Sequence, residues 1–373
     1  MLTICGFNGF GQFGVEHGCR INQPKGITFE ASTDVKSELL VATWSYTAFA
    51  AGCQLWLKGC LQNKPNAHLT LITADPIKQL AACDKYCLVL LESGKLFKIA
   101  PKTDSVLQEL KFANLNEDMD VMQALPRKRS IFGEFRSNLE YSLKITHIAC
   151  GVQLACAISS TNGVYNIPSK IHHFPQHLRV QQLVCGFEHA LLLTTNGDVY
   201  AWGNGIRGQL GQEPMGIKEC PTLIDALAGI KITCIAAGGW HSAAISAFGD
   251  LYTCGFNPNG QLGLRVFKDN NGLKNPTVYP LPQLVDSPIC CTTENKESTE
   301  VGNECAPLKV YTGSRHTFLQ MSCGVLFASG WNAHGQLGLV SQNDFVDQFS
   351  RVKMEDKNVD IVCGAWCTIF KKR

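Results

Sequence analysis

The sequence predicts an all-β fold, a seven-bladed β-propeller whose ring is closed by N-terminal strands that complete the last blade. Three observations predict it. A unit of about fifty residues repeats along the chain, each unit holds short β-prone runs separated by turn residues, and the two chain ends carry complementary parts of one unit. A single unit cannot bury both faces of its sheet, so the units must stack on one another around a ring.

The repeat is clearest in three copies with the same internal offsets. A Gly is followed by a His at plus three, by a Gly at plus eleven and another at plus seventeen, and the copy closes on Gly-Gln-Leu-Gly. The residues that recur are Gly186, His189, Gly203, Gly208 and Gln209; Gly238, His241, Gly255, Gly260 and Gln261; and Gly313, His316, Gly330, Gly335 and Gln336. We expect structural roles for all of them, because glycines serve positive-φ turn positions and the His rings hold a strand or loop by hydrogen bonds.

Each copy also contains a predicted hairpin. In the best copy the apolar run 190–193 is followed by Asn196-Gly197 and then by an alternating run that ends at Trp202. Asn and Gly accept the positive φ of tight hairpin turns, so the two runs are expected to pair.

Weaker copies bring the number of units to seven. Their first positions, called anchors from here on, are Thr43, Cys83, Gly151, Gly186, Gly238, Gly313 and Gly364. The interval from Gly151 to Gly186 is only 35 residues and lacks Gly-Gln-Leu-Gly, so it is too short for a full blade and predicts an irregular one. Its pair His172-His173 is expected on an exposed loop.

The two ends of the chain complement each other. After Gly364 the sequence stops before a second strand and a closing turn, and these parts stand at the other end, in residues 2–8 and 11–14. From Gly364 round the ring to Thr43 is 52 residues, as from Gly186 to Gly238. We therefore predict one propeller domain over residues 1–373, with divergent blades in 15–180 and regular repeats in 183–373.

Composition argues against several classes of protein. The chain is 45% hydrophobic with a mean hydropathy near zero, as is typical of soluble proteins, and no apolar run reaches membrane-spanning length. The N-terminus has no basic region followed by a long apolar stretch, so no secretory signal is expected. The net charge of +2 predicts no basic face for nucleic acid.

The 18 cysteines are interpreted as reduced. Many occupy strand or anchor positions, where cysteine packs as a small apolar residue; these are Cys150, Cys156, Cys185, Cys234, Cys254, Cys323, Cys363 and Cys367. Disulfides are the second interpretation, disfavoured without a secretion signal. A zinc site is less favoured still, because the sequence has no paired Cys-x-x-Cys.

Two insertions interrupt the repeats. The longer, between Cys83 and Gly151, carries the basic run Arg127, Lys128 and Arg129, which is either a solvated loop or a patch for nuclear import or partner binding. The other, near residues 287–307, is rich in Thr, Glu, Asn and Lys and predicts a polar loop on one face.

No motif supports catalysis, a cofactor or a metal. Residues 203–208 match the dinucleotide fingerprint Gly-x-Gly-x-x-Gly, but no helix start follows them. The recurring His residues fill equivalent positions in separate blades, and nucleophile-elbow, His-Glu-x-x-His and phosphate-loop motifs are absent. We expect a non-enzymatic protein.

The repeated Gly-x-x-His, Val-Tyr-x-Trp-Gly and Gly-Gln-Leu-Gly motifs resemble the regulator of chromosome condensation family, strongly over residues 183–373 and 1–14 and weakly over 15–180. The segment 43–48 and the small size resemble one small animal member, a partner of a Jumonji-domain 2-oxoglutarate oxygenase. The resemblance implies a scaffold of the nucleus, with the cytoplasm as a second location and without secretion, which acts in histone methylation or chromosome segregation. It would be a monomeric propeller in a hetero-complex, with residues 1–180 as the expected partner surface.

The resemblance leaves two alternatives open. The founding member of the family is a guanine-nucleotide exchange factor for a small nuclear GTPase, and direct nucleosome binding is the other alternative. Plant ultraviolet photoreceptors of this fold use a dense tryptophan cluster. This chain has six tryptophans and no repeated Trp-Arg pattern, so that function is disfavoured.

Overall fold

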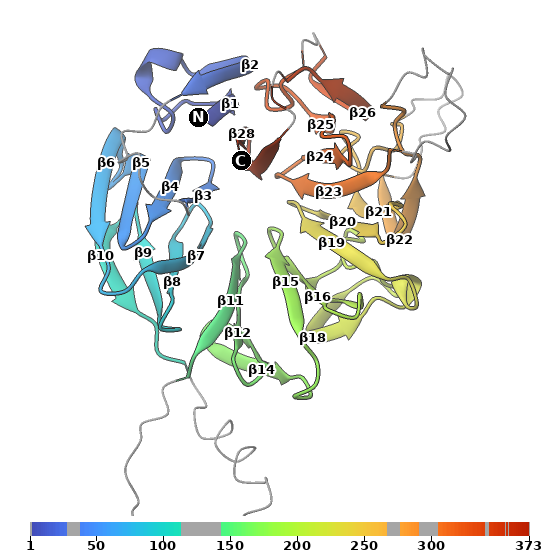
Figure 1. The fold of residues 1–373 in the computed structure, drawn as a ribbon, viewed down its shortest axis with the longest axis horizontal. Coiled ribbons are helices and arrows are strands. Elements are labelled where there is room, and N and C mark those ends of the chain that lie inside the picture. The colour runs from blue at the N-terminus through green and yellow to red at the C-terminus, as the bar shows by residue number, and fades with distance from the viewer. Residues whose placement is uncertain are drawn as a thin grey trace, which may run out of the picture.

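Seven four-stranded antiparallel sheets stand in a ring (Figure 1). This computed structural model describes residues 2–27, 38–112, 143–266, 277–290, 305–339, 343–354, 356 and 358–372. The described residues are almost entirely strands and turns, with two short 3-10 helices, Val15–His17 and Asp225–Leu227. The predicted seven-bladed β-propeller is confirmed.

The first strand of each blade lies innermost, because these strands contact one another around the ring. From the inside outward, the blades are β3 (Glu38–Ala42), β4 (Tyr46–Ala51), β5 (Gln54–Leu61) and β6 (Lys64–Ile72); β7 (Ile77–Ala82), β8 (Cys87–Leu91), β9 (Leu96–Ala100) and β10 (Asp104–Glu109); β11 (Ile145–Cys150), β12 (Ala155–Ser159), β13 (Gly163–Asn166) and β14 (Ser169–His173); β15 (Val180–Cys185), β16 (His189–Thr194), β17 (Val199–Asn204) and β18 (Ile217–Leu223); β19 (Ile232–Ala237), β20 (His241–Ser246), β21 (Leu251–Phe256) and β22 (Val278–Val285); β23 (Pro307–Thr312), β24 (His316–Met321), β25 (Leu326–Trp331) and β26 (Phe345–Val352); and β27 (Val359–Cys363), β28 (Cys367–Lys372), β1 (Leu2–Phe7) and β2 (Arg20–Ile27). Every anchor directly follows an innermost strand.

The last blade is built from both ends of the chain. Strand β1 pairs with β28, from Leu2 opposite Lys371 to Gly6 opposite Cys367, and its other edge pairs with β2. The two termini lie close together within this blade (Figure 1). The predicted closure is confirmed, and it leaves neither β1 nor β28 as an open edge.

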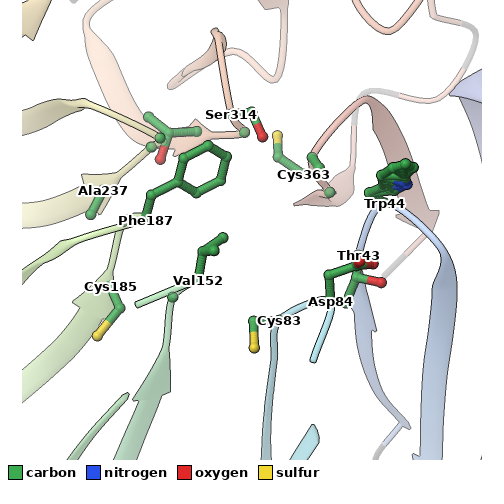
Figure 2. A pocket seen from close by; sticks show the side chains of 18 of the residues that line it. Thr43, Trp44, Cys83, Asp84, Val152, Cys185, Phe187, Ala237, Ser314 and Cys363 are labelled. Atoms are coloured by element: carbon green, nitrogen blue, oxygen red, sulfur yellow. The ribbon is translucent and has the colours of Figure 1, made fainter. Parts of the chain in front are cut away.

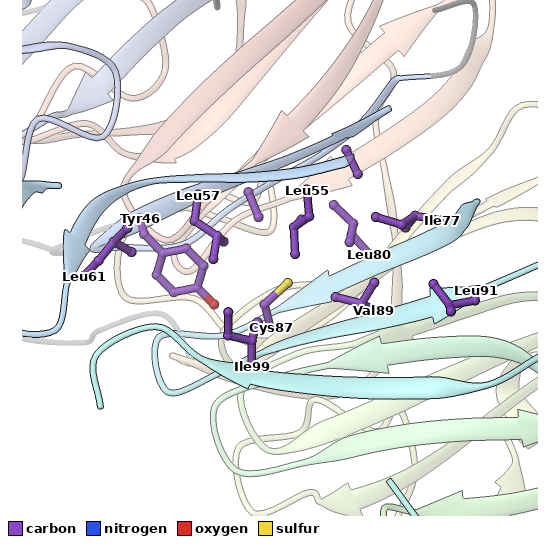
Figure 3. Close-up of a cluster of buried hydrophobic side chains, with 12 residues drawn as sticks. Tyr46, Leu55, Leu57, Leu61, Ile77, Leu80, Cys87, Val89, Leu91 and Ile99 are labelled. Carbon is purple, nitrogen blue, oxygen red and sulfur yellow. The ribbon is translucent and has the colours of Figure 1, made fainter. Parts of the chain in front are cut away.

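The hydrophobic core is divided into layers between neighbouring blades. One layer packs Tyr46, Leu55 and Leu57 of one blade against Leu80 and Val89 of the next (Figure 3). The second strand of a blade lies between two such layers, so β4, β16, β20 and β24 are buried along their full length. The outer strands face solvent on one side, so exposed and less exposed residues alternate along them, as in β6.

The blade that begins at Gly151 corrects two predictions. It is a complete sheet of four strands, since β13 and β14 are joined by a tight connection in place of the long closing loop. The interval from Gly151 to Gly186 is short because the closing loop is absent from this blade, while all four strands are present. His172 and His173 lie in β14 and are half-buried, not on an exposed loop, and the His172 ring packs edge-on against Phe174.

Some predictions fall on parts of the chain that the structure does not describe. Arg127, Lys128 and Arg129 lie outside the described residues, as do residues 291–304 of the predicted polar loop. Within the described residues, the helices are too short to cross a membrane.

Candidate functional site at the anchor cavity

The seven anchor loops meet around a cavity of about 470 Å3, called the anchor cavity from here on (Figure 2). Each blade contributes the last residue of its innermost strand, its anchor and the residue after the anchor. The same short segment therefore lines the cavity seven times, once from each blade. The chemistry of the cavity depends on the side chains that each blade has in this segment.

Histidine rings join neighbouring blades beside this cavity. His189, His241 and His316 each begin the second strand of their blade and are fully buried. Their Nε2 atoms lie 2.9, 3.0 and 3.3 Å from a hydroxyl oxygen of the following blade, in the order Ser242, Thr317 and Thr368.

The same hydroxyls fix the protonation of the rings. Ser242, Thr317 and Thr368 donate to the backbone carbonyls of Gln209, Gln261 and Gln336, at 2.6, 2.6 and 2.8 Å. A hydroxyl has a single proton to donate, so it must accept from the His, and Nε2 carries the ring proton. Burial lowers the pKa of each of the three rings to about 3, so they are neutral.

The recurring glycines make room for these contacts. A Cβ at Gly186, Gly238 or Gly313 would clash with the ring of the His three residues later. The Gly-x-x-His offset therefore has a steric cause: the ring lies over the anchor of its own blade.

The glycine at plus seventeen has a different reason. Gly203, Gly255 and Gly330 have φ of +100°, +111° and +108°, and a Cβ there would meet the carbonyl of the residue that precedes the His. A side chain is excluded both by the backbone conformation and by this close approach.

In three blades the closing loop docks on the outer strand of the next blade. A Cβ on Gly208, Gly260 or Gly335, all with positive φ, would press on the backbone at Tyr279, Asp347 or Asn22. The buried Gln209, Gln261 and Gln336 accept a backbone N–H from within their own loops, from Arg207, Asn259 and His334. Of the sequence-predicted repeat residues, the anchors Gly186, Gly238 and Gly313 line the cavity, and the others lie at blade interfaces or loops.

An arc of aromatic and cationic side chains follows one side of the anchor cavity. The position two residues after the anchor is Trp240, Arg315 and Trp366 in three consecutive blades. With Trp331 and Trp44 these residues form what we call the aromatic arc. The Arg315 guanidinium lies 5.9 Å from the ring centres of both Trp240 and Trp331, and Trp366 lies edge-on to Trp331 at 5.5 Å.

The arc continues as a stack of rings. Trp366 stacks on Trp44 at 5.2 Å and, on its other side, on His334 at 5.2 Å. Phe10 stacks on the far face of this group against Trp44 at 5.4 Å. All of these rings are half-buried, so they keep some surface accessible at the edge of the cavity.

Two indole groups of the arc have unused donors. Trp44 Nε1, Trp240 Nε1 and the neighbouring Ser314 Oγ are buried and have no hydrogen-bond partner among the described residues. Buried donors normally find a partner, so these three atoms are candidates for contacts with a bound molecule.

The opposite side of the cavity carries thiols and one acid. Asp84 is the acidic side chain among the described lining residues, and it accepts from Ser45 Oγ and pairs with Lys102. A hydrogen bond from Cys150 lowers the pKa of the Cys83 thiol to about 7, while Cys150 itself is shifted upward. The charge that the cavity can offer a ligand is therefore chiefly that of Arg315.

The dinucleotide-like segment 203–208 does not form a nucleotide site. Asn204 ends β17, the following residues form turns, and the chain then continues to β18 without a helix. The helix N-terminus that binds the pyrophosphate in such sites is missing from this part of the chain.

Comparison with known proteins places these repeats in a family. A model of the regulator of chromosome condensation (RCC1) repeat matches residues 196–245, and a second model of the same repeat matches 180–209 and 232–261. The chain is 34% identical to mouse RCC1 domain-containing protein 1 over 223 residues, covering 51% of this chain and 55% of the mouse protein. Residues 180–261 of this chain therefore carry regulator of chromosome condensation repeats. The match spans about half the length of the curated relatives.

Two solved structures share the fold over the whole chain. Prp20p from Saccharomyces cerevisiae superposes with a TM-score of 0.70 at 17% identity, over 100% of this chain and 91% of that chain. Human WBSCR16 superposes with a TM-score of 0.72 at 16% identity, over 100% and 99%. At this identity the likeness establishes the regulator of chromosome condensation propeller fold alone.

Sequence analysis identified only part of this site. Trp44, Trp240 and Trp366 stand in the anchor segments of three separate blades, and nothing in the sequence shows that they belong to one arc. Arg315 was missed, although its offset of two from Gly313 matches that of Trp240 from Gly238. Aligning the seven anchors position by position would have revealed the arc.

Proposed function

We propose that this propeller is a non-enzymatic scaffold that binds a protein partner at the anchor cavity. The observation that carries the proposal is the aromatic arc, in which tryptophan and arginine from consecutive blades gather at the edge of a concave surface. Tryptophan and arginine dominate the binding energy of protein interfaces, particularly beside a pocket.

The arc favours an extended segment with an acidic group and a flat or apolar side chain. A carboxylate would pair with the Arg315 guanidinium between two indole rings. Backbone carbonyls of the same segment would accept from Trp44 Nε1 and Trp240 Nε1.

The proposed partner is a Jumonji-domain 2-oxoglutarate oxygenase in the nucleus, acting in histone methylation or chromosome segregation. The resemblance to the small animal member of the family and the 34% identity to mouse RCC1 domain-containing protein 1 support this choice. Contact through residues 1–180 is part of the proposal, and Trp44 and Asp84 bring that half of the chain to the cavity. Arg127, Lys128 and Arg129 are proposed as a second contact.

The test measures binding of the purified protein to its organism's Jumonji-domain oxygenase by calorimetry and by co-elution. Arg315→Ala and Trp366→Ala are each expected to weaken the complex at least about 10-fold, as for truncation of interface anchors. Phe248→Ala is the matched control, since it removes an aromatic side chain that is 86% exposed and does not line the anchor cavity. Equal affinity for all four proteins would exclude the cavity, and no complex would exclude this partner.

Two alternatives are tested beside it. The structure report on Prp20p describes binding to Gsp1p and histones. We expect catalysed nucleotide release from a small nuclear GTPase to stay at background, since Asp84 is already paired with Lys102. Release above background, or nucleosome binding that Arg315→Ala abolishes, would replace the oxygenase as the proposed partner.

A further inference from the structure

Three cysteines that are distant in sequence converge at the boundary between two blades. Cys290 follows β22 at the end of one blade, Cys305 precedes β23 at the start of the next, and Cys323 lies in the turn between β24 and β25. Their sulfur atoms all lie within 4.8 Å of one another. The segments that carry Cys290 and Cys305 flank residues 291–304, so the cluster stands where both ends of that insertion meet the propeller.

The spacing of the sulfur atoms suits a thiolate metal site. Cys290 Sγ and Cys323 Sγ are 3.5 Å apart. Thiolates that bind one zinc ion at about 2.3 Å in tetrahedral geometry lie about 3.8 Å from one another. Small rotations of the three side chains would therefore place every sulfur at bonding distance from one ion.

The chemistry of the cluster favours a cation over a plain apolar contact. Ser322 Oγ donates to Cys305 Sγ at 3.5 Å, so the cluster also has a polar neighbour. Three thiolates side by side repel one another unless a positive ion neutralises them, and a divalent soft metal does so.

We propose that Cys290, Cys305 and Cys323 bind one zinc ion, which joins both ends of the insertion to the β24–β25 turn. Three protein ligands leave the fourth tetrahedral position to a solvent molecule. The site is separate from the anchor cavity, and its role is to fix the positions of Cys290 and Cys305, which flank residues 291–304.

The first test measures metal in the full-length protein purified under reducing conditions without chelator. About one zinc per chain is expected. Cys305→Ser and Cys323→Ser should bind zinc at least about 100-fold more weakly, because even loss of a partner outside the ligand shell costs about 10- to 100-fold. Cys234→Ser is the matched control: Cys234 packs on the same core layer but is not part of the cluster.

A second test does not depend on the variants. The metal-free protein is titrated with cobalt(II), and the thiolate charge-transfer band should have the intensity of three thiolates per ion, together with the visible bands of tetrahedral cobalt. The proposal would be overturned by a chain that binds no zinc, by zinc content equal in Cys323→Ser and wild type, or by a Cys290–Cys323 disulfide found in the same reducing buffer.

Discussion

Gly238 is fixed as glycine by two neighbours: a Cβ there would clash with the ring of His241 and would lie 2.7 Å from the carbonyl oxygen of Gly313. Its φ is not positive, so the constraint comes from packing and not from backbone conformation. The ring in turn donates to Thr317 of the next blade. A single residue thus controls whether a buried hydrogen bond between two blades forms.

Gly238→Ala is therefore expected to destabilise the protein by about 2–3 kcal/mol, the range for overpacking a closed site. Urea unfolding measures the change. In a His241→Ala background the same substitution should cost less, because only the contact with the Gly313 carbonyl oxygen remains. Gly216→Ala is the control, since a Cβ there meets nothing within 4 Å, and it should be neutral within about 0.5 kcal/mol. Equal costs in both backgrounds would show that the ring is not the cause.

At the scale of the element, strand β1 decides whether the ring closes. It is a central strand of its sheet, between β2 and β28, and Ile4 is fully buried. A proline in the middle of a sheet removes an amide donor from the ladder.

Ile4→Pro is expected to cost about 3 kcal/mol or more and to expose β28 as an open edge. Ile4→Val, which keeps the amide, should cost only about 0.5–1.5 kcal/mol. Urea unfolding and proteolysis of the N-terminal segment measure the two effects. A proline variant as stable as the valine variant would mean that β1 pairing does not close the ring.

The strands that recur in each repeat were predictable from the sequence. The side-chain clusters that form between different repeats were not. In three blades the repeat has one steric cause, a His ring over Gly186, Gly238 or Gly313, and its fixed offset made the weaker copies recognisable. The prediction of an incomplete blade after Gly151 is wrong, because a short interval shows only that residues are missing and not whether they belong to a loop or to a strand. The cysteine cluster had no sequence signal, since its members belong to two blades and share no offset.

At the scale of the whole molecule, three buried histidines couple the stability of the ring to pH. They stand at three successive blade interfaces, and each has its pKa lowered by burial from 6.5 to about 3. Below pH 6.5 the unfolded chain binds protons at these positions while the folded chain does not. Stability is therefore full above pH 6.5 and falls as the pH drops towards 3, by up to about 1.4 kcal/mol per pH unit for each ring.

We expect the free energy of unfolding to fall steeply between pH 6.5 and 5, above the range in which ordinary carboxylates titrate. Urea unfolding at several pH values measures the slope. Replacing His241 by Gln, which keeps an amide donor and does not titrate, should lower stability at pH 7.5 but reduce the slope by up to about 1.4 kcal/mol per pH unit, one ring's share. His147, His172 and His334 also have pKa values lowered by burial, so part of the slope will persist. The same slope in wild type and in His241→Gln would mean that burial does not lower the pKa of this ring in the folded protein.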